Sequence, residues 1–445
     1  MSVARSARTV IEENDAVKVA LALLVVYAVI VPLVWNLNPD ADARLNTIVA
    51  QLRLVTFFAA AYALLTLALN LHWGYTGLFN IGVAGFMAVG VYTMAIVTRP
   101  PEPLTGPPGF GLPLWIGVLA GMLAAAIVGF IAALPALRLR ADYFAIVTLA
   151  ISEIIRLTLQ SSAFSRFLVD TISVGTNGGS GLRLSKSPDD FVAELFLVEG
   201  SIGRGPTGVG ELVFTEVGNQ LVVQLPFGVV QAQVFIQSMY VVVLAVAVAA
   251  FYWFLARLGR SPFGRILKAI REDELVANSL GKNVSLAKIK VFMIGCALMG
   301  LAGVLWQGSQ GTVSPTPQFR PVITFYIFVA MMLGGAGSNT GSVIGGILFA
   351  GILFEAPRKF GSLLRNAFDG ANPANFADAV TGGLPAFLVY FSDNIAAVQF
   401  IILGVVLIAM MHGRPEGILG HRTEEAAAVR LADRPTRADG GETDE

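Results

Sequence analysis

Long runs without charged residues alternate with short charged segments along this chain. No Asp, Glu, Lys or Arg occurs at 19–39, 54–98 or 321–354. A helix that crosses a membrane needs about 20 consecutive, mostly apolar residues. The runs therefore predict helices near 17–35, 112–134, 143–160, 232–255, 286–307 and 396–411, two more between 53 and 99, and two short or broken ones between 320 and 355.

Glycine-rich segments interrupt two of these runs. The first reads NLHWGYTG at 70–77, and the second reads LGGAGSNTGS at 333–342. An interrupted helix is tolerated in a membrane where its backbone is buried in protein or lines a cavity. The first segment therefore either lines a cavity or forms a tight turn between packed helices. The second is expected to form a glycine hairpin between two short helices.

The composition supports a membrane protein. Hydrophobic residues make up 55% of the 445 residues and charged residues only 13%, whereas soluble proteins carry about 25% charged residues. The formal net charge of zero gives no reason to expect a nucleic-acid partner. Because Cys296 is the only cysteine and the three histidines show no ligand spacing, we expect no disulfide and no metal site. The predicted fold is an all-α, polytopic membrane bundle of about 8 to 10 transmembrane or broken helices.

The most charged segment lies between two apolar runs, from Arg257 to Asn283. Its basic residues come first and are followed by the acidic Glu272, Asp273 and Glu274. Positively charged loops stay in the cytoplasm, so this loop is expected to face inward. Two interpretations remain open: the loop binds a soluble partner, or its charges only set the orientation of the chain.

The order of these segments predicts the organisation of the chain. Two polar insertions are placed outside the membrane, and both termini are placed in the cytoplasm. The predicted parts are a cytoplasmic segment 1–16, a first transmembrane half 17–160, an extracytoplasmic insertion 161–231, a second transmembrane half 232–355 with a cytoplasmic loop 256–285, a second extracytoplasmic segment 356–395, a last transmembrane helix 396–411, and a partly disordered cytoplasmic tail 412–445.

A pair of opposite charges falls within one predicted helix. With a rise of about 1.5 Å per residue, Glu153 lies roughly 16 Å along the helix from Asp142, near the middle of the membrane. Arg156 is on the same face and can pair with it. Charges inside a membrane usually face the bundle interior, so the pair is either structural or part of a translocation path. Polar groups in or beside apolar runs are the candidates for that path: Tyr75, Asn80, Glu153, Arg156 and Asn339.

No catalytic constellation is visible in the sequence. No nucleophile, base and orienting group occur at a recognisable spacing, so the chain is predicted not to be an enzyme. The glycine-rich string TNGGSGL at 176–182 is not followed by a lysine and lacks the context of a phosphate-binding loop.

Six segments resemble the M-type permease subunit of branched-chain amino acid ABC importers. They occur in the order of that family and are spread over nearly the whole chain. The segments are LNLHWGYTGLFNIGVAGFMAVGVYT (69–93), LRLRADYFAIVTLAISEIIRL (137–157), TNGGSGL (176–182), the stretch 261–306 that begins SPFGRILKAIREDELVANSLGKN, MMLGGAGSNTGSVIGGILF (331–349) and GRPEGILG (413–420).

This resemblance implies a subunit of a multi-pass importer in the bacterial inner membrane. The chain would pair with a second homologous permease and two ATP-binding subunits, and a periplasmic binding protein would deliver the substrate. The loop at 262–283 would be the coupling helix that docks on the ATPase. Its implied coupling residues are Arg271, Glu272, Asp273, Glu274, Ala277 and Gly281. The chain has no G-x-x-x-x-G-K-[ST] motif, so it is expected to bind no cofactor itself, with ATP and Mg²⁺ at the partner subunit.

Other functions are weighed beside this one. Within the same family, a permease for urea or short amides is an alternative. A secondary transporter driven by an ion gradient would need buried acids along its path, and only Glu153 meets that description. A membrane-embedded enzyme or scaffold would need clustered His, Asp or Glu at membrane depth.

Overall fold

The computed structural model describes residues 14–35, 41–103, 105–136, 141–200, 203–217, 220–226, 228–368 and 373–420. Of the predicted cytoplasmic ends, 1–13 and 421–445 therefore lie outside the described residues. The long helices are α2 (Asp15–Trp35), α3 (Ala41–Thr76), α4 (Val83–Thr98), α5 (Leu114–Ala136), α6 (Ala141–Gln160), α10 (Ala232–Arg260), α13 (Val284–Gln307), α15 (Pro321–Gly334), α16 (Asn339–Leu348), α17 (Ala356–Ala367) and α20 (Ile395–Gly413).

The prediction of an all-α polytopic membrane bundle is confirmed. In the described ranges, eight helices are long and apolar enough to cross a membrane. A ninth candidate is the pair formed by α6 and α7 (Ser162–Ile172), which are bent by 69° at a short break. The helix α4 is apolar but shorter.

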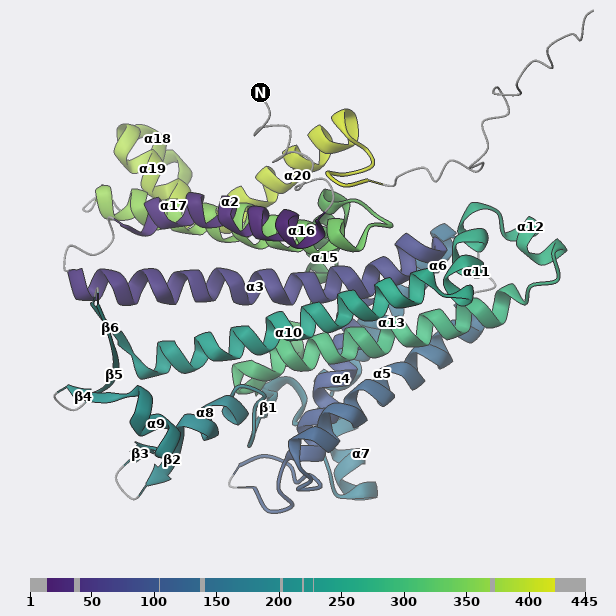
Figure 1. Cartoon of the computed structure of the whole chain (residues 1–445), viewed down its shortest axis with the longest axis horizontal. Coiled ribbons are helices and arrows are strands. Elements are labelled where there is room, and N and C mark those ends of the chain that lie inside the picture. Colours follow the sequence, from purple (N-terminus) through teal and green to yellow (C-terminus); the bar gives the residue numbers. More distant parts are fainter. Residues whose placement is uncertain are drawn as a thin grey trace, which may run out of the picture.

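The helix α3 lies at the centre of the bundle. It packs against α10 and α13 on one side and against α16 and α2 on the other (Figure 1). This helix begins at Ala41, so it extends well beyond the uncharged run that starts after Arg53. It ends where Gly77 adopts a positive φ of 71°, a conformation that costs glycine little. The interruption predicted at 70–77 is therefore displaced: residues 70–76 are still helical, and the break between α3 and α4 runs from 77 to 82.

Small residues allow α4, α5 and α13 to cross closely. A Cβ atom on Gly90 would lie 2.6 Å from the Gly300 Cα, and one on Gly300 would lie 2.6 Å from the Ala125 Cβ. Distances this short leave no room for a side chain. Membrane helices commonly use small residues in this way to gain van der Waals contact between backbones.

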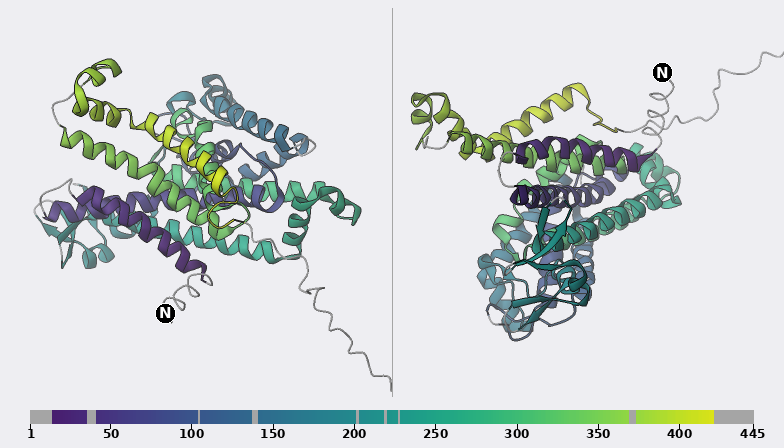
Figure 2. Two further views of the ribbon diagram at one scale, coloured as in Figure 1. Left: turned by 90° about the horizontal axis from the view of Figure 1, so that it is seen from above. Right: turned by 60° about the vertical axis from the view of Figure 1, so that its left-hand side comes forward.

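The second glycine-rich segment separates α15 from α16, but the following helix is not short. The helix that begins with α16 continues through a π-helical stretch (Phe349–Glu355) into α17 without interruption. This continuous helix ends at Ala367. This single long helix is visible in green in Figure 2. The sequence had suggested a helix boundary near Glu355, because the uncharged run ends there. The charge is instead accommodated inside the helix, where Glu355 is buried and pairs with Arg358 one turn later.

The two polar insertions fold into short elements. The first contains α7, α8 (Asp190–Phe196), α9 (Gly208–Val213) and small antiparallel sheets of β2 (Leu197–Gly200) with β3 (Gly203–Pro206), and of β4 (Thr215–Val217), β5 (Gln220–Leu225) and β6 (Gly228–Gln231). The second, predicted at 356–395, instead begins with α17 as the continuation of a candidate membrane helix, Asn339–Ala367, and then contains α18 (Phe376–Thr381) and α19 (Gly383–Asp393). The strands β4 to β6 and the helices α18 and α19 lie at the end of the bundle opposite α11 (Pro262–Glu272) and α12 (Glu274–Ser279) (Figure 1).

The close crossing at Gly300 makes a prediction about folding. We expect Gly300→Val to reduce strongly the amount of monodisperse protein recovered in detergent, because the added side chain forces α13 away from α5. Gly404→Val in α20 is the matched control, since no atom lies within 4 Å of a Cβ at that position. Equal recovery of the two variants by size-exclusion chromatography would contradict the packing argument.

Candidate coupling site

The two glycine-rich segments, 70–77 and 333–342, contact each other through an asparagine pair. The Asn70 Nδ2 on α3 donates to the Asn339 Oδ1, 3.0 Å away, at the start of α16. The Asn70 Oδ1 accepts from the backbone N–H of Gly337 at 2.7 Å. One side chain thus satisfies a freed backbone group of the second break, which lipid cannot do.

Tyr75 extends this cluster to α10. Its hydroxyl lies 3.3 Å from the Asn339 Oδ1 and 3.4 Å from the Leu255 carbonyl oxygen. Gly259 makes the approach possible, because a Cβ there would lie 2.7 Å from the Tyr75 hydroxyl oxygen. The structure therefore brings together two of the predicted path residues, Tyr75 and Asn339.

The charged loop reaches the same place. The Arg271 Nη1, in the last turn of α11, donates to the carbonyl of Gly74. Carbonyls in the last turn of a helix lack intrahelical partners, and cations near them are favourable. Gly74 is in the last turn of α3, so Arg271 attaches the loop to the first break.

Local sequence explains the shape of the loop. Ser261 caps α11 by accepting from the Gly264 N–H, and Pro262 stands at the first helical position. Asp273 ends α11 and caps α12, because its side chain accepts from the N–H groups of Leu275 and Val276. Gly281 closes α12 with a φ of 73°.

Apolar side chains on α12 point away from the bundle. Leu275, Val276 and Leu280 are 78%, 54% and 70% exposed, whereas Ala277 is buried. Glu274 forms an ion pair with Lys288 of α13 at 2.6 Å, and Glu272 is exposed. The three exposed residues, Leu275, Val276 and Leu280, are called the α12 apolar patch below.

Asn80 lies in a separate, fully buried network. Its Nδ2 is 3.1 Å from the His72 Nδ1, and the His72 Nε2 is 3.1 Å from the Phe292 carbonyl oxygen. This pattern places the imidazole hydrogen on Nε2. The Asn80 Oδ1 accepts from the Gly82 N–H at 2.8 Å. Asn80 therefore shapes the break between α3 and α4 from inside the core.

Glu153 and Arg156 pair on α6, as their spacing suggested. The Arg156 Nε donates to the Glu153 Oε2 at 2.9 Å, a second contact joins the Arg156 Nη2 to the Glu153 Oε1, and the Arg156 Nη1 donates to Gln160. The Glu153 side chain is 34% exposed and that of Arg156 is 13% exposed. No hydrogen bond in the described ranges joins this pair to Tyr75 or Asn339.

Several residues of the site were not singled out from the sequence. Asn70 is the most connected of them. Thr148 and Thr324 also contribute, since their hydroxyls accept from the N–H groups of Ile81 and Ala84 at 3.0 and 3.1 Å. The sequence feature that could have identified these residues is a lone polar residue in an apolar helix, because such a residue usually forms a hydrogen bond to another helix.

The described ranges contain no group of three or more His, Cys, Asp or Glu residues that could hold a metal ion. What they contain is a multi-pass bundle with two broken helices joined to a charged loop. These features define the class of integral membrane transport permeases.

Comparison with known proteins identifies the family. Residues 52–411 match the family described as branched-chain amino acid transport system / permease component, and the chain belongs to that family. Two similar relatives are the high-affinity branched-chain amino acid transport system permease proteins LivM of Salmonella typhimurium and Escherichia coli, each 31% identical over 296 residues. The match covers 64% of this chain and 59% of each relative. The permease protein LivH of Salmonella typhimurium is 36% identical over 88 residues, which are 20% of this chain and 28% of LivH. No solved structure matches the chain significantly.

The asparagine pair predicts coupled effects on stability. Removing Asn70 leaves the half-buried Asn339 amide and Gly337 N–H without this partner, at a cost of up to about 1–3 kcal/mol. We therefore expect Asn70→Ala to lower the midpoint of thermal unfolding in detergent, while Asn278→Ala on the exposed face of α12 leaves it unchanged. The double variant Asn70→Ala/Asn339→Ala should lose less than the sum of the two single variants. Additive losses would contradict a direct interaction.

A second prediction concerns the ion pair on α6. Glu153→Gln leaves a mostly buried cation without its partner, so we expect it to reduce folded protein more than Glu153→Gln/Arg156→Gln does. Fluorescence-detected size-exclusion chromatography of both variants makes the comparison. A double variant that is equally or more damaged would argue against a purely structural pair.

Proposed function

We propose that this chain is one of two permease subunits of an ATP-driven importer for branched-chain amino acids in the bacterial inner membrane. Family membership supports the transport role, and the similarity to both LivM and LivH supports a second homologous permease as partner. Two ATP-binding subunits and a periplasmic binding protein complete the proposed assembly. ATP and Mg²⁺ bind at the ATPase, and this chain holds no cofactor.

The α12 apolar patch is the observation that carries the ATPase proposal. Exposed apolar residues that gather at one place on a surface commonly mark a protein interaction site. The patch stands at the tip of the loop, at one end of the bundle (Figure 1).

The proposed coupling follows the contacts of the site. When ATP closes the ATPase dimer, the ATPase moves α11 and α12. Arg271 transmits this motion to Gly74 at the end of α3, and Asn70 and Tyr75 transmit it to Asn339. Both broken helices then reorient together, which alternates access to the path. Such a change requires that the two conformations differ in their contacts with the ATPase.

Purification from the native membrane tests the proposal. We expect the tagged chain, extracted in mild detergent, to retain a second permease and an ATP-binding subunit, both identified by mass. Uptake of labelled leucine by the reconstituted assembly should require ATP, and leucine, isoleucine and valine should compete with one another. Uptake that survives ATP depletion under an ion gradient would instead support a secondary transporter, and competition by urea or acetamide alone would support an amide permease.

Variants of the loop make a sharper prediction. We expect Leu275→Asp to weaken binding of the ATPase by at least about tenfold, because a charge replaces an apolar contact. The matched control is Leu212→Asp on α9, which changes a leucine that is 88% exposed at the opposite end of the bundle. Pull-down titration of the ATPase measures both affinities.

Two further variants disturb the loop itself. Gly281→Pro is incompatible with the positive φ at that position, and Glu274→Lys replaces the ion pair with Lys288 by a repulsion. Both should abolish substrate-stimulated ATPase activity while the helices remain inserted. Full stimulation in either variant would show that the loop does not couple the subunits.

A further inference from the structure

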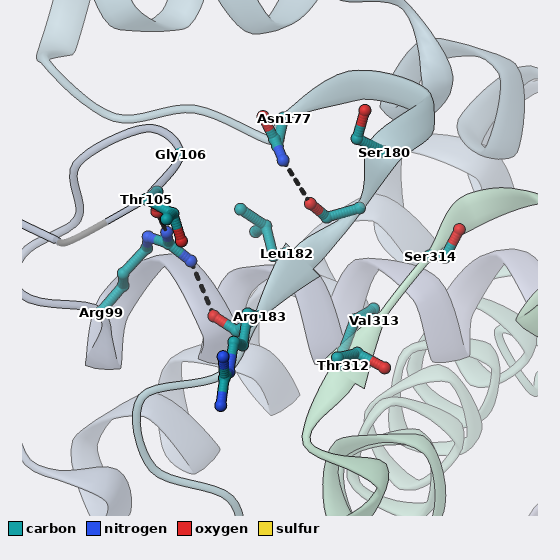
Figure 3. Close-up of a pocket in the computed structure, with 11 residues that line it drawn as sticks. Arg99, Thr105, Gly106, Asn177, Ser180, Leu182, Arg183, Thr312, Val313 and Ser314 are labelled. Carbon is teal, nitrogen blue, oxygen red and sulfur yellow. Dashed lines mark hydrogen bonds between the residues drawn. The ribbon is translucent and has the colours of Figure 1, made fainter.

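A polar cavity of about 380 Å³ lies at the end of α4, away from α11 and α12. Its walls come from the segments that follow α4, precede β1 (Leu182–Arg183) and form β7 (Thr312–Val313). β1 and β7 pair antiparallel at its base. The residues that line it are shown in Figure 3.

Arg99 is the unusual member of this cavity. It is only 4% exposed, yet no described carboxylate forms an ion pair with it. The Arg99 Nε donates to the Pro107 carbonyl at 2.7 Å, Nη1 donates to the Arg183 carbonyl at 2.7 Å, and Nη2 donates to the Thr105 carbonyl. Burial lowers the pKa of this guanidinium. Neutral carbonyls accept three of its hydrogens but do not balance its charge, and a buried cation without a counterion is costly.

The remaining lining is suited to an anion. None of the eleven lining residues is acidic. Arg183 faces Arg99 with its backbone carbonyl, and its exposed side chain points away from the cavity (Figure 3). The hydroxyls of Ser180 and Ser314 also line the cavity, and neither donates to another described residue. Of the five N–H groups of Arg99, two donate to no described residue. Arginine and hydroxyl donors together are typical of sites that recognise a carboxylate.

The backbone around the cavity is shaped before any ligand arrives. Gly106 has a φ of 81°, and a Cβ there would lie 2.9 Å from the Arg99 Nη2. Asn177 has a φ of 59°, and its Nδ2 donates to the Gly181 carbonyl at 2.6 Å. The glycine-rich string at 176–182, which lacks the context of a phosphate loop, thus forms one wall of this cavity. A site that is already ordered loses less entropy when it binds.

We propose that this cavity is a subsite for the carboxylate of a small amino acid on the outer side of the permease. The inference deepens the proposed function and rests on it. The volume lies near the lower end of the range for small-molecule sites, about 300–1,000 Å³. Arg99 pairs with the carboxylate, and the lining hydroxyls orient it.

Binding of isovalerate to the full assembly in lipid nanodiscs tests the subsite. Isovaleramide has the same shape without the charge. We expect isovalerate to raise the midpoint of thermal unfolding and to bind at least about tenfold more tightly than isovaleramide, as the loss of charge-assisted hydrogen bonds implies. Equal binding of the two probes would overturn the proposal.

Two substitutions at one position form a matched pair of variants, because one introduces a carboxylate next to the cavity and the other introduces the uncharged amide of similar size. Thr105 is exposed and lies beside the Arg99 guanidinium (Figure 3). We expect Thr105→Asp to occupy the subsite from within and weaken isovalerate at least about tenfold, while Thr105→Asn leaves its affinity within about twofold. These variants keep Arg99, whose replacement would also remove three bonds that hold the surrounding loops.

The same variants distinguish two sources of the carboxylate. If isovalerate does not bind, but Thr105→Asp alone weakens binding of the periplasmic protein to the assembly, an acidic side chain of that protein occupies the subsite. If neither measurement separates the Asp variant from the Asn variant, the inference is wrong. If the wild-type assembly still takes up leucine in an ATP-dependent manner, the proposed function is supported even though the subsite is wrong. If the purified chain has no ATPase partner, the proposed function itself is wrong.

Discussion

Backbone groups freed at a helix break need a partner inside the protein, because the hydrocarbon of a membrane offers none. Two breaks impose this constraint here, at 77–82 and 335–338. Thr148 on α6 and Thr324 on α15 accept from backbone N–H groups at and just after the first break, and Asn70 on α3 accepts from Gly337 in the second. Because every partner stands on a different helix, satisfying the breaks also determines how these helices pack.

The same requirement links the breaks to the surface. Arg271 binds a carbonyl at the end of α3, although 197 residues separate it from Gly74 in the chain. The amphipathic α11 packs inward, and α12 leaves its apolar residues exposed. Hydrogen bonds from Arg271 to Gly74 and from Asn70 to Asn339 therefore connect the charged loop with the end of α3 and the start of α16.

The two ends of the bundle carry different chemistry. The α12 apolar patch suits a protein partner that excludes water. The cavity around Arg99 offers cationic and hydroxyl donors without an acidic residue, which suits a small anion. Close glycine contacts pack α4, α5 and α13 tightly against one another.

The sequence by itself determined the helices and the class of protein. Uncharged runs about as long as a membrane is thick predicted most of the long helices, and the glycine-rich segments marked both breaks. The spacing of Glu153 and Arg156 placed them on one face. Only the tertiary structure decided that Asn70 joins α3 to the second break, that Arg271 contacts Gly74, and that the chain continues as a helix through Glu355 to Ala367. Hydropathy and helical period are local properties, whereas these contacts depend on partners that are distant in sequence or on the burial of a charge. Local pattern does not contain that information.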